Sequence, residues 1–300
     1  MAREKIVPVF VPHLGCPQNC VFCNQKRITG ELKSATKDDV PKDADGQIAF
    51  YGGSFTAVPA KLQEELLEAA KGHVIRLSTR PDAIDEETLE RLKKYGVETV
   101  ELGAQSLDDE VLKLSRRGHT AKDVEDASNL IKQYGFKLIL QMMTGLPGDS
   151  EEKDIATAKK IIALNPDGVR IYPTVIIKDT DLYDMYLEGT YKEHTVEDAI
   201  EVCSKLLPLF EDASIPVIRL GLNPTDDLSG GDAVGGAYHP ALGELVKSRI
   251  RRNEMEKKVI DGTEEFYVPK NLLSQYLGQK RCNVEYFHEK YGVDVIIHAI

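Results

Sequence analysis

The stretch HLGCPQNCVFCNQ (residues 13–25) holds three of the five cysteines of the chain. Their spacing is Cys16-x3-Cys20-x2-Cys23, and they directly follow Ile6–Pro12, an apolar run typical of a strand. Cysteine thiolates are the usual protein ligands of iron–sulfur clusters. Three thiolates can hold three irons of a cubane and leave the fourth iron open to a bound molecule. The spacing therefore predicts a [4Fe–4S] cluster on Cys16, Cys20 and Cys23.

The sequence also allows other uses of these cysteines. A zinc site normally has four ligands, and the fourth would have to be His13 or a distant cysteine. A chance cluster of buried cysteines is the second alternative. The odd number of cysteines argues against a disulfide framework. Cys203 lies in an amphipathic helical pattern and is expected in the core, and Cys282 is too far along the chain for a second cluster to be expected.

Strands and helices are predicted to alternate along most of the chain. Between the predicted strands, apolar residues recur three and four positions apart, as they do in amphipathic helices. The predicted strands are Ile6–Pro12, Gln47–Tyr51, His73–Ser78, Thr99–Gly103, Lys137–Met142 and Val169–Tyr172. Strands that alternate with helices pair in parallel. The pattern predicts an α/β fold, either a partial (β/α)6 barrel of the TIM type or a doubly wound sheet.

The alternation ends near residue 220, which suggests a barrel over residues 1–220 and a Gly-rich loop with a small C-terminal α/β extension over residues 221–300. The loop, GLNPTDDLSGGDAVGGAYH (221–239), has the length of either a lid over the barrel or a linker. A lid would contact substrate, and its candidate contacts are Tyr238 and His239. Tyr172, at the end of the sixth predicted strand, is a further candidate substrate contact, with a plain core tyrosine as the alternative.

Charge and composition limit the classes of function. The chain has 300 residues, of which 29% are charged, and a formal net charge of −11. This acidic balance argues against a large nucleic-acid footprint, which usually needs a basic face. The basic run KSRIRRNEMEKK (247–258) is either a local phosphate-binding segment or a solvated helix face. The absence of a long apolar run or a signal-peptide pattern predicts no membrane span and a cytoplasmic location.

Six further motifs follow the cysteines in an order that is typical of one family. They are FYGGSF (50–55), STRPD (78–82), VELGAQS (100–106), RRGHT (116–120), MMTGLPG (142–148) and RIYPTVIIKDTDLYDMYLEG (170–189). With the cysteine motif, this set resembles the radical S-adenosylmethionine (SAM) superfamily. Residues 6–220 are similar to the radical SAM domain of the Elongator catalytic subunit and its bacterial relatives. The resemblance implies the partial barrel, with the reactive loops at the carboxyl ends of the strands.

The resemblance also implies which residues contact SAM. Gly52 and Gly53 would let backbone carbonyls approach the SAM amino group, because glycine has no Cβ; a tight turn is the alternative. Arg117 resembles the arginine that pairs with the SAM carboxylate in enzymes similar to oxygen-independent coproporphyrinogen oxidase. Arg116 is a neighbouring candidate, and a solvated helix end is the alternative for both arginines.

Three further SAM contacts are implied by position in the motifs. Gln105 would bind the ribose or the adenosine, and Gln141 takes the place of an Asp in the coproporphyrinogen oxidase-like enzymes. Ser78 stands where relatives often have a ribose-binding Glu. A serine hydroxyl is shorter and uncharged, so Arg80 or Glu101 could compensate; a structural strand residue is the alternative for Glu101.

The chemistry that the resemblance implies is reductive cleavage of SAM. The open iron would chelate SAM, and an electron would break a carbon–sulfur bond to give a 5′-deoxyadenosyl radical that abstracts hydrogen from a substrate. A protein such as flavodoxin or ferredoxin would donate the electron. The acetyltransferase domain of the Elongator subunit is not expected, because residues 221–300 are too few to form it.

The substrate cannot be identified from the sequence, and two alternatives to a general radical SAM function stay open. The first is an RNA (tRNA) modification enzyme with the same radical chemistry, which the Elongator-like motifs and the basic run favour. The second is a non-enzymatic iron–sulfur protein that binds RNA or another partner.

Overall fold

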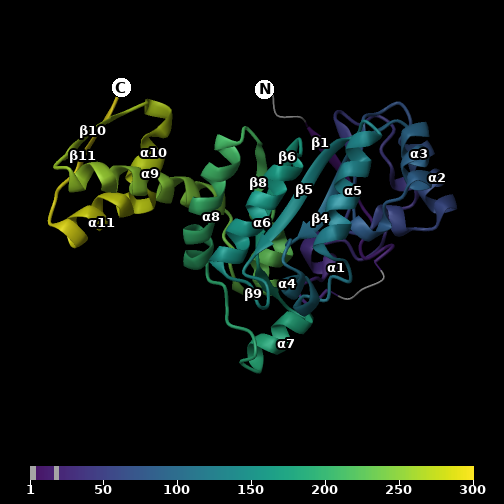
Figure 1. The fold of residues 1–300 in the computed structure, drawn as a ribbon, viewed down its shortest axis with the longest axis horizontal. Helices are drawn as coiled ribbons and strands as arrows, with labels where there is room; N and C mark the ends of the chain where they lie inside the picture. The colour runs from purple at the N-terminus through teal and green to yellow at the C-terminus, as the bar shows by residue number, and fades with distance from the viewer. Residues whose placement is uncertain (1–4, 17–19) are drawn as a thin grey trace.

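A computed structural model describes residues 5–16 and 20–300, and it shows a curled parallel sheet covered by helices, with a small module at the far end of a long helix (Figure 1). In the described chain the sheet has seven strands, in the order β1-β2-β3-β4-β5-β6-β8, and every neighbouring pair is parallel. The strands are β1 (Ile6–Phe10), β2 (Gln47–Tyr51), β3 (Ile75–Thr79), β4 (Val97–Gln105), β5 (Lys137–Thr144), β6 (Gly168–Pro173) and β8 (Val217–Leu220). Strand order follows chain order, as in a barrel, whereas a doubly wound sheet changes direction. The predicted partial barrel is therefore confirmed.

Helices cover the convex face of this sheet and bury one side of the strands β1 to β6. They are α2 (Ala60–Ala69), α3 (Glu86–Lys94), α5 (Ala121–Gln133), α6 (Glu151–Leu164) and α8 (Val196–Asp212), whereas the short α4 (Asp109–Leu114) packs against the cysteine loop. Because strand side chains alternate between faces, Phe50, Leu77 and Leu102 point into this helical layer and are fully buried there. Their neighbours along each strand point to the concave face, where the polar residues of the barrel gather.

Side chains that cap the backbone fix where the helices begin. The Asp85 side chain accepts a hydrogen bond of 2.7 Å from the backbone N–H of Thr88, and α3 begins at the next residue, Glu86. An aspartate in this position satisfies an N–H group that has no partner inside the helix. Glu86 and Glu87 in the first turn also face the positive end of the helix dipole.

The seventh strand was not predicted. β8 has only four residues, and none of them is fully buried, so its apolar signal is weak. It pairs with β6 and forms one edge of the sheet. The sheet also differs in strand length, because β4 spans Val97–Gln105 where the pattern indicated Thr99–Gly103.

The Gly-rich segment, residues 221–239, lies against the barrel. Its strand β9 (Ala233–Gly236) pairs antiparallel with β7 (Val175–Ile177), and the N–H of Ala237 donates to the carbonyl of Thr174 at 2.9 Å. A Cβ at Gly236 would come within 2.6 Å of the Thr174 carbonyl oxygen, so this pairing requires glycine. The expected domain boundary at residue 220 stays a prediction.

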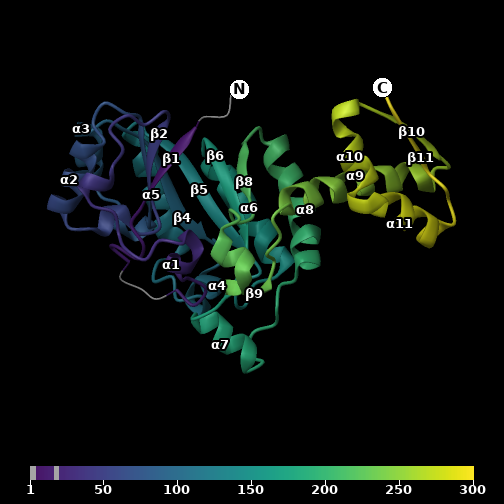
Figure 2. The ribbon, with the colours of Figure 1, turned by 180° about the vertical axis from the view of Figure 1, so that it is seen from behind.

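The C-terminal module has its own small core. Its elements are α9 (Leu242–Ile260), β10 (Glu265–Val268), α10 (Leu273–Leu277), α11 (Cys282–Tyr291) and β11 (Ile296–Ala299). Met255, Phe266 and Phe287 are buried together between the two-stranded parallel sheet and the helices. The first half of α9 packs on α8, and the second half carries the module away from the barrel (Figures 1 and 2). None of the helices in the described chain is long and apolar enough to cross a bilayer.

Candidate functional site

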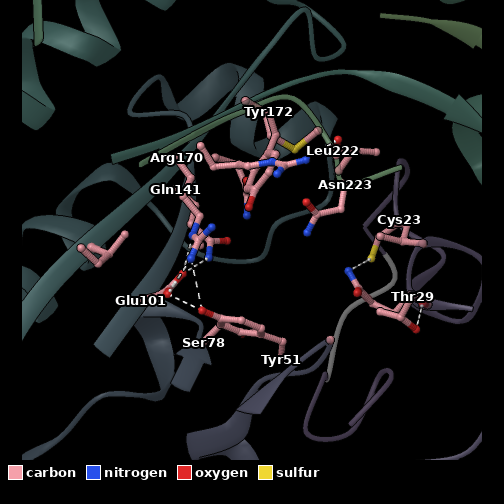
Figure 3. Close-up of a pocket in the computed structure, with 18 of the residues that line it drawn as sticks. Cys23, Thr29, Tyr51, Ser78, Glu101, Gln141, Arg170, Tyr172, Leu222 and Asn223 are labelled. Atoms are coloured by element: carbon pink, nitrogen blue, oxygen red, sulfur yellow. Dashed lines mark hydrogen bonds and ion pairs between the residues drawn. The ribbon is translucent and has the colours of Figure 1, made fainter. Parts of the chain in front are cut away.

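A large cavity occupies the concave face of the sheet, and we call it the barrel groove. Its volume is about 2020 Å³, larger than the roughly 300–1,000 Å³ of most ligand pockets. Cys16, Cys20 and Cys23 line one end of the groove, and side chains of β2 to β6 line its wall. Figure 3 shows Cys23 across the cavity from Glu101 and Arg170. The groove has room for a cofactor and a second molecule.

The loop that carries the first cysteine packs directly on the turn after β2. A Cβ at Gly15 would come within 2.2 Å of the Ser54 carbonyl oxygen, and a Cβ at Gly53 within 2.4 Å of the Leu14 carbonyl oxygen. The N–H of Ser54 donates to that Leu14 oxygen at 2.8 Å. Only glycine allows so close an approach of two backbones. These contacts fix the position of Cys16 relative to β2.

Gly52 and Gly53 form a tight turn that lines the groove. Gly52 has a φ of 91°, and its carbonyl accepts a hydrogen bond of 2.9 Å from the N–H of His13. The ring of His13 in turn accepts from the N–H of Gln25, the first residue of α1 (Gln25–Thr29), at 3.0 Å. His13 therefore supports the loop on both sides. The predicted contact between this turn and SAM is not tested by these bonds and stays a prediction.

The segment that carries the other two cysteines is held by α4, α7 (Asp181–Leu187) and α1. The N–H of Val21 donates to Ser115, after α4, and its carbonyl accepts from Leu182 in α7 at 2.8 Å. The side chain of Gln25 donates to Cys23 Sγ at 3.3 Å. The cysteine loop is thus anchored to three parts of the barrel mouth.

The chemistry of these thiols fits a cationic ligand. Burial raises the pKa of Cys23 to about 12, and the nearby Cys20 adds to the rise. Burial and Cys20 likewise raise the pKa of Cys16, while Arg117 and Arg80 act in the opposite direction. Such thiols become thiolates only next to strong positive charge, which the irons of a cluster provide. Among the described residues, no three His, Cys, Asp or Glu side chains surround a single ion, whereas in a cubane each thiolate binds its own iron.

Arg117 lies beside the cysteines, in the loop after α4 rather than on a helix. Only 7% of it is exposed; Nη1 donates to Cys20 Sγ at 3.1 Å and Nη2 to the Gly103 carbonyl at 2.7 Å. Its buried Nε has no hydrogen-bond partner among the described residues. Arg116 is mostly exposed and pairs with Asp181. Of the two candidate arginines, Arg117 is therefore the one that is buried beside the cysteines, and its predicted contact with the SAM carboxylate stays a prediction.

Gln105 ends β4 in a strained conformation. Its φ of 66° lies in the left-handed region, and the register of the β4–β5 pair shifts between Gly103 and Gln105. A Cβ at Gly103 would come within 2.8 Å of the Gln105 amide nitrogen. A left-handed residue other than glycine costs on the order of 1–2 kcal/mol and often marks a functional position. The side chain lines the groove, as a SAM contact would.

A buried charged network occupies the groove wall, and we call it the Glu101 network. Glu101 has no exposed surface and accepts hydrogen bonds from Tyr51 (2.6 Å), Arg76 (3.1 Å), Gln141 (2.9 Å) and Arg170 (2.8 Å), as Figure 3 shows in part. Burial by itself would raise the pKa of the carboxyl, but Arg170, Tyr51 and Arg76 lower it below the usual value. The network therefore holds Glu101 as a carboxylate.

Sequence reasoning missed most of this network. It named Gln141 as a SAM contact and Glu101 as either a substitute for the short Ser78 or a structural strand residue. The groups that contact Glu101 include Arg76 and Arg170, which were not considered. The missing signal is the alternation along β3 and β6, where each arginine stands between apolar residues and must point to the concave face. Ser78 lies opposite Glu101 in the sheet. Ser78 and Tyr172 both line the groove.

Several candidate residues lie elsewhere or are already paired. The Arg80 guanidinium donates to both carboxylate oxygens of Asp82, from Nε at 2.9 Å and from Nη2 at 2.8 Å. Tyr238 and His239 do not line the groove: the Tyr238 hydroxyl bonds Ser229, and the His239 ring accepts from the N–H of Ala241. The other two cysteines are a fully buried Cys203 in α8, as predicted, and an exposed Cys282 at the start of α11.

Comparisons with known proteins agree with this geometry. The family model described as "Radical SAM superfamily" matches residues 10–161, and the model of the "Radical_SAM C-terminal domain" matches residues 166–252. A tRNA uridine(34) acetyltransferase of Methanocaldococcus infernus is 33% identical over 217 residues, which cover 70% of this chain and 40% of that protein. The chain thus spans less than half of that relative.

Solved structures give the same result. The archaeal Methanocaldococcus infernus Elp3 superposes with a TM-score of 0.62 and 25% identity over 97% of this chain and 68% of that one. Coproporphyrinogen III oxidase of Escherichia coli, a radical SAM enzyme, shares the fold with a TM-score of 0.55 and 18% identity, over 71% of this chain and 54% of its own. With its cysteine motif at the mouth of a partial barrel, this chain belongs to the radical SAM superfamily of enzymes.

Proposed function

We propose that this protein reductively cleaves SAM, using a [4Fe–4S] cluster on Cys16, Cys20 and Cys23. The observation that carries the proposal is the position of Arg117, whose buried guanidinium reaches Cys20 and keeps one nitrogen without a partner among the described residues. When bound, the cluster would supply the electron that breaks a carbon–sulfur bond of SAM and releases a 5′-deoxyadenosyl radical. A reduced flavodoxin or ferredoxin would supply that electron to the cluster.

The residues of the chain would bind and orient the cofactors. Arg117 would pair with the SAM carboxylate, the carbonyls of the Gly52–Gly53 turn would accept from its amino group, and Gln105 would hold the ribose or adenosine. The helices on the convex side of the sheet and the groove wall would exclude water from the radical. Ser78 and Gln141, which line the groove, would add further SAM contacts. Substrate would occupy the remaining part of the groove, near Tyr172.

Iron loading tests the cluster directly. Protein reconstituted under anaerobic conditions should contain about four irons per chain and show the absorption of a [4Fe–4S] cluster. The triple variant Cys16→Ala/Cys20→Ala/Cys23→Ala should contain none, and the double variant Cys203→Ala/Cys282→Ala should load like the wild type. An intact cluster in the triple variant would overturn the assignment.

RNA is the second candidate substrate. The relative at 33% identity is a tRNA uridine acetyltransferase, and the groove is large enough for a flipped base beside SAM. If RNA is the substrate, unmodified tRNA should accelerate SAM cleavage and acquire a modified base, detectable by mass spectrometry. If tRNA has no effect on SAM cleavage, tRNA is excluded as the substrate, and the proposed cleavage of SAM is not affected.

A further inference from the structure

Three segments that are distant in the sequence meet at the mouth of the barrel groove. Helix α1 follows Cys23 directly, the turn 178–180 connects β7 to α7, and the Gly-rich segment (221–239) follows β8. Residues of all three segments line the groove, among them Ile28, Thr180 and Asn223. In a partial barrel the first and last strands do not pair, so this meeting of α1 with the Gly-rich segment joins the two ends of the structure.

Arg27 is the centre of this junction. Its Nε donates to Asp179 Oδ2 at 2.9 Å, Nη2 contacts the same oxygen, and Nη1 donates to Asp232 Oδ2 at 2.7 Å. About 32% of the Arg27 side chain and 18% of the Asp232 side chain are exposed, so the second pair is partly shielded from water. One guanidinium therefore joins α1 to both other segments.

Apolar and backbone contacts support the same junction. Ile28, the next residue of α1, packs with Leu222 and with the buried Val175, Ile177 and Leu228. The Asn24 side chain, which caps α1, also donates to the carbonyl of Asp179 at 3.4 Å. Because α1 has only five residues, its own hydrogen bonds cannot hold it in place.

One residue of α1 connects this junction to Cys23, a candidate ligand of the cluster. Gln25, at the start of α1, donates its side-chain N–H to Cys23 Sγ at 3.3 Å and its backbone N–H to the ring of His13 at 3.0 Å. A displacement of α1 would move Gln25 and both of these contacts. The position of Cys23 thus depends on contacts made with residues about 155 and 205 positions away in the chain.

We propose that Arg27 is a positioning residue that couples the Gly-rich segment to the cysteine loop, so that closing of the groove mouth and retention of the cluster at Cys23 are one event. The inference rests on the proposed function for its cluster part. In this proposal, residues 221–239 close the gap between the first and last strands of the open barrel. The Arg27–Asp232 ion pair holds this segment in place, and a bound substrate could replace that pair with contacts of its own.

The coupling is tested from its distant end. Asp232→Asn removes a charge more than 200 residues from the cysteines. It should increase the hydrogen-exchange rate of amides in residues 20–30 by about tenfold, because hydrogen bonds to a charged partner limit local opening. Unchanged exchange in residues 20–30 would overturn the coupling. Hydrogen exchange can be measured without iron. It therefore tests the coupling even if the wild-type protein binds no cluster. A lack of cluster binding would refute only the proposed function.

The second readout is the rate at which reconstituted protein loses iron to a strong chelator without SAM. Arg27→Gln should lose iron roughly tenfold faster than the wild type, and Arg27→Lys, which keeps the charge but not the fork, should fall between them. Arg251→Gln is the matched control, because Arg251 is similarly exposed (29%) and pairs with Glu254 in the distant α9.

A charge exchange separates a specific pair from general damage. Arg27→Asp should lose iron fastest, and Arg27→Asp/Asp232→Arg should slow the loss again by restoring an opposite-charge pair. If the double variant loses iron as fast as Arg27→Asp, or if Arg27→Gln loses it at the wild-type rate, Arg27 does not position Cys23. The double variant also keeps the test valid if Arg27→Gln takes up too little iron to measure.

Discussion

The Glu101 network in the groove and the pairs between α8 and α9 both consist of glutamates bonded to arginines. They differ in the exposure of the glutamate to water. Glu101 has no exposed surface and contacts Arg76 and Arg170. Glu201 on α8 is 45% exposed and pairs with Arg249 of α9 at 2.6 Å. Water can replace a lost partner at Glu201 but not at Glu101. Ion pairs of similar length in the two regions should therefore have unequal effects on stability and function.

The comparison also separates two kinds of sequence signal. The basic run 247–258 is conspicuous because its charges lie close together in the sequence, yet the buried Arg249 and the partly exposed Arg251 pair with the half-exposed Glu201 and Glu254. The groove arginines come from strands far apart in the sequence, and only the fold brings them together. The run is part of a helix that buries Ser248, Arg249 and Met255 and forms ion pairs through its arginines, so neither a fully solvated face nor a phosphate site describes it.

The largest effect is expected from removing the buried carboxylate. Glu101→Gln leaves Arg76 and Arg170 with a neutral partner in a buried site, which should lower the free energy of unfolding by about 3–5 kcal/mol. Glu201→Gln, the exposed counterpart, should lower it by less than about 1 kcal/mol. Urea unfolding followed by circular dichroism measures both values. Equal losses in the two variants would contradict the contrast between the regions.

A somewhat smaller effect is expected at the cofactor end of the groove. Arg117→Ala should weaken SAM binding by about 2–4 kcal/mol, or roughly 30- to 1,000-fold, because a charge-assisted pair in a buried site is lost. The iron content should not change. Arg116→Ala is the control, since its guanidinium lies on the surface with Asp181. Equilibrium binding of SAM to the loaded protein gives the affinities, and an unchanged affinity for Arg117→Ala would show that another group holds the carboxylate.

The smallest effect is a difference in acid stability. The pKa of Glu101 is lower in the folded protein than in the unfolded chain, so the unfolded state binds a proton first as the pH falls. The stabilisation is complete above the usual glutamate pKa of about 4.3 and is lost as the pH falls through the lower, folded value. Wild-type stability should therefore decrease more steeply below pH ~4 than that of Glu101→Gln. Parallel pH profiles would mean that Glu101 does not contribute.

The barrel and the cysteine triad could be predicted because their signals are local. The strand–helix alternation and the Cys16-x3-Cys20-x2-Cys23 spacing each lie within short stretches of sequence. The Glu101 network, the Arg27 junction and strand β8 could not be predicted in the same way. Their partners lie about 25 to 205 positions apart, and β8 is too short and too exposed to show a clear apolar pattern.

Gly-rich residues 221–239 illustrate the same limit. Their composition is equally typical of a linker and of a lid, because glycine permits both. What distinguishes the two is the pairing of β9 with β7 and the Arg27–Asp232 pair, and both depend on the folded barrel. The candidate contacts Tyr238 and His239 were chosen from that composition alone, and neither lines the groove.

The most direct test of the central claim is the amount of 5′-deoxyadenosine that the reduced, cluster-loaded protein forms from SAM. Chromatography with mass detection should show product that accumulates with time under anaerobic conditions with dithionite or reduced flavodoxin. The triple cysteine variant should form none. A protein that carries about four irons and binds SAM, yet forms no 5′-deoxyadenosine with any reductant, would contradict the account.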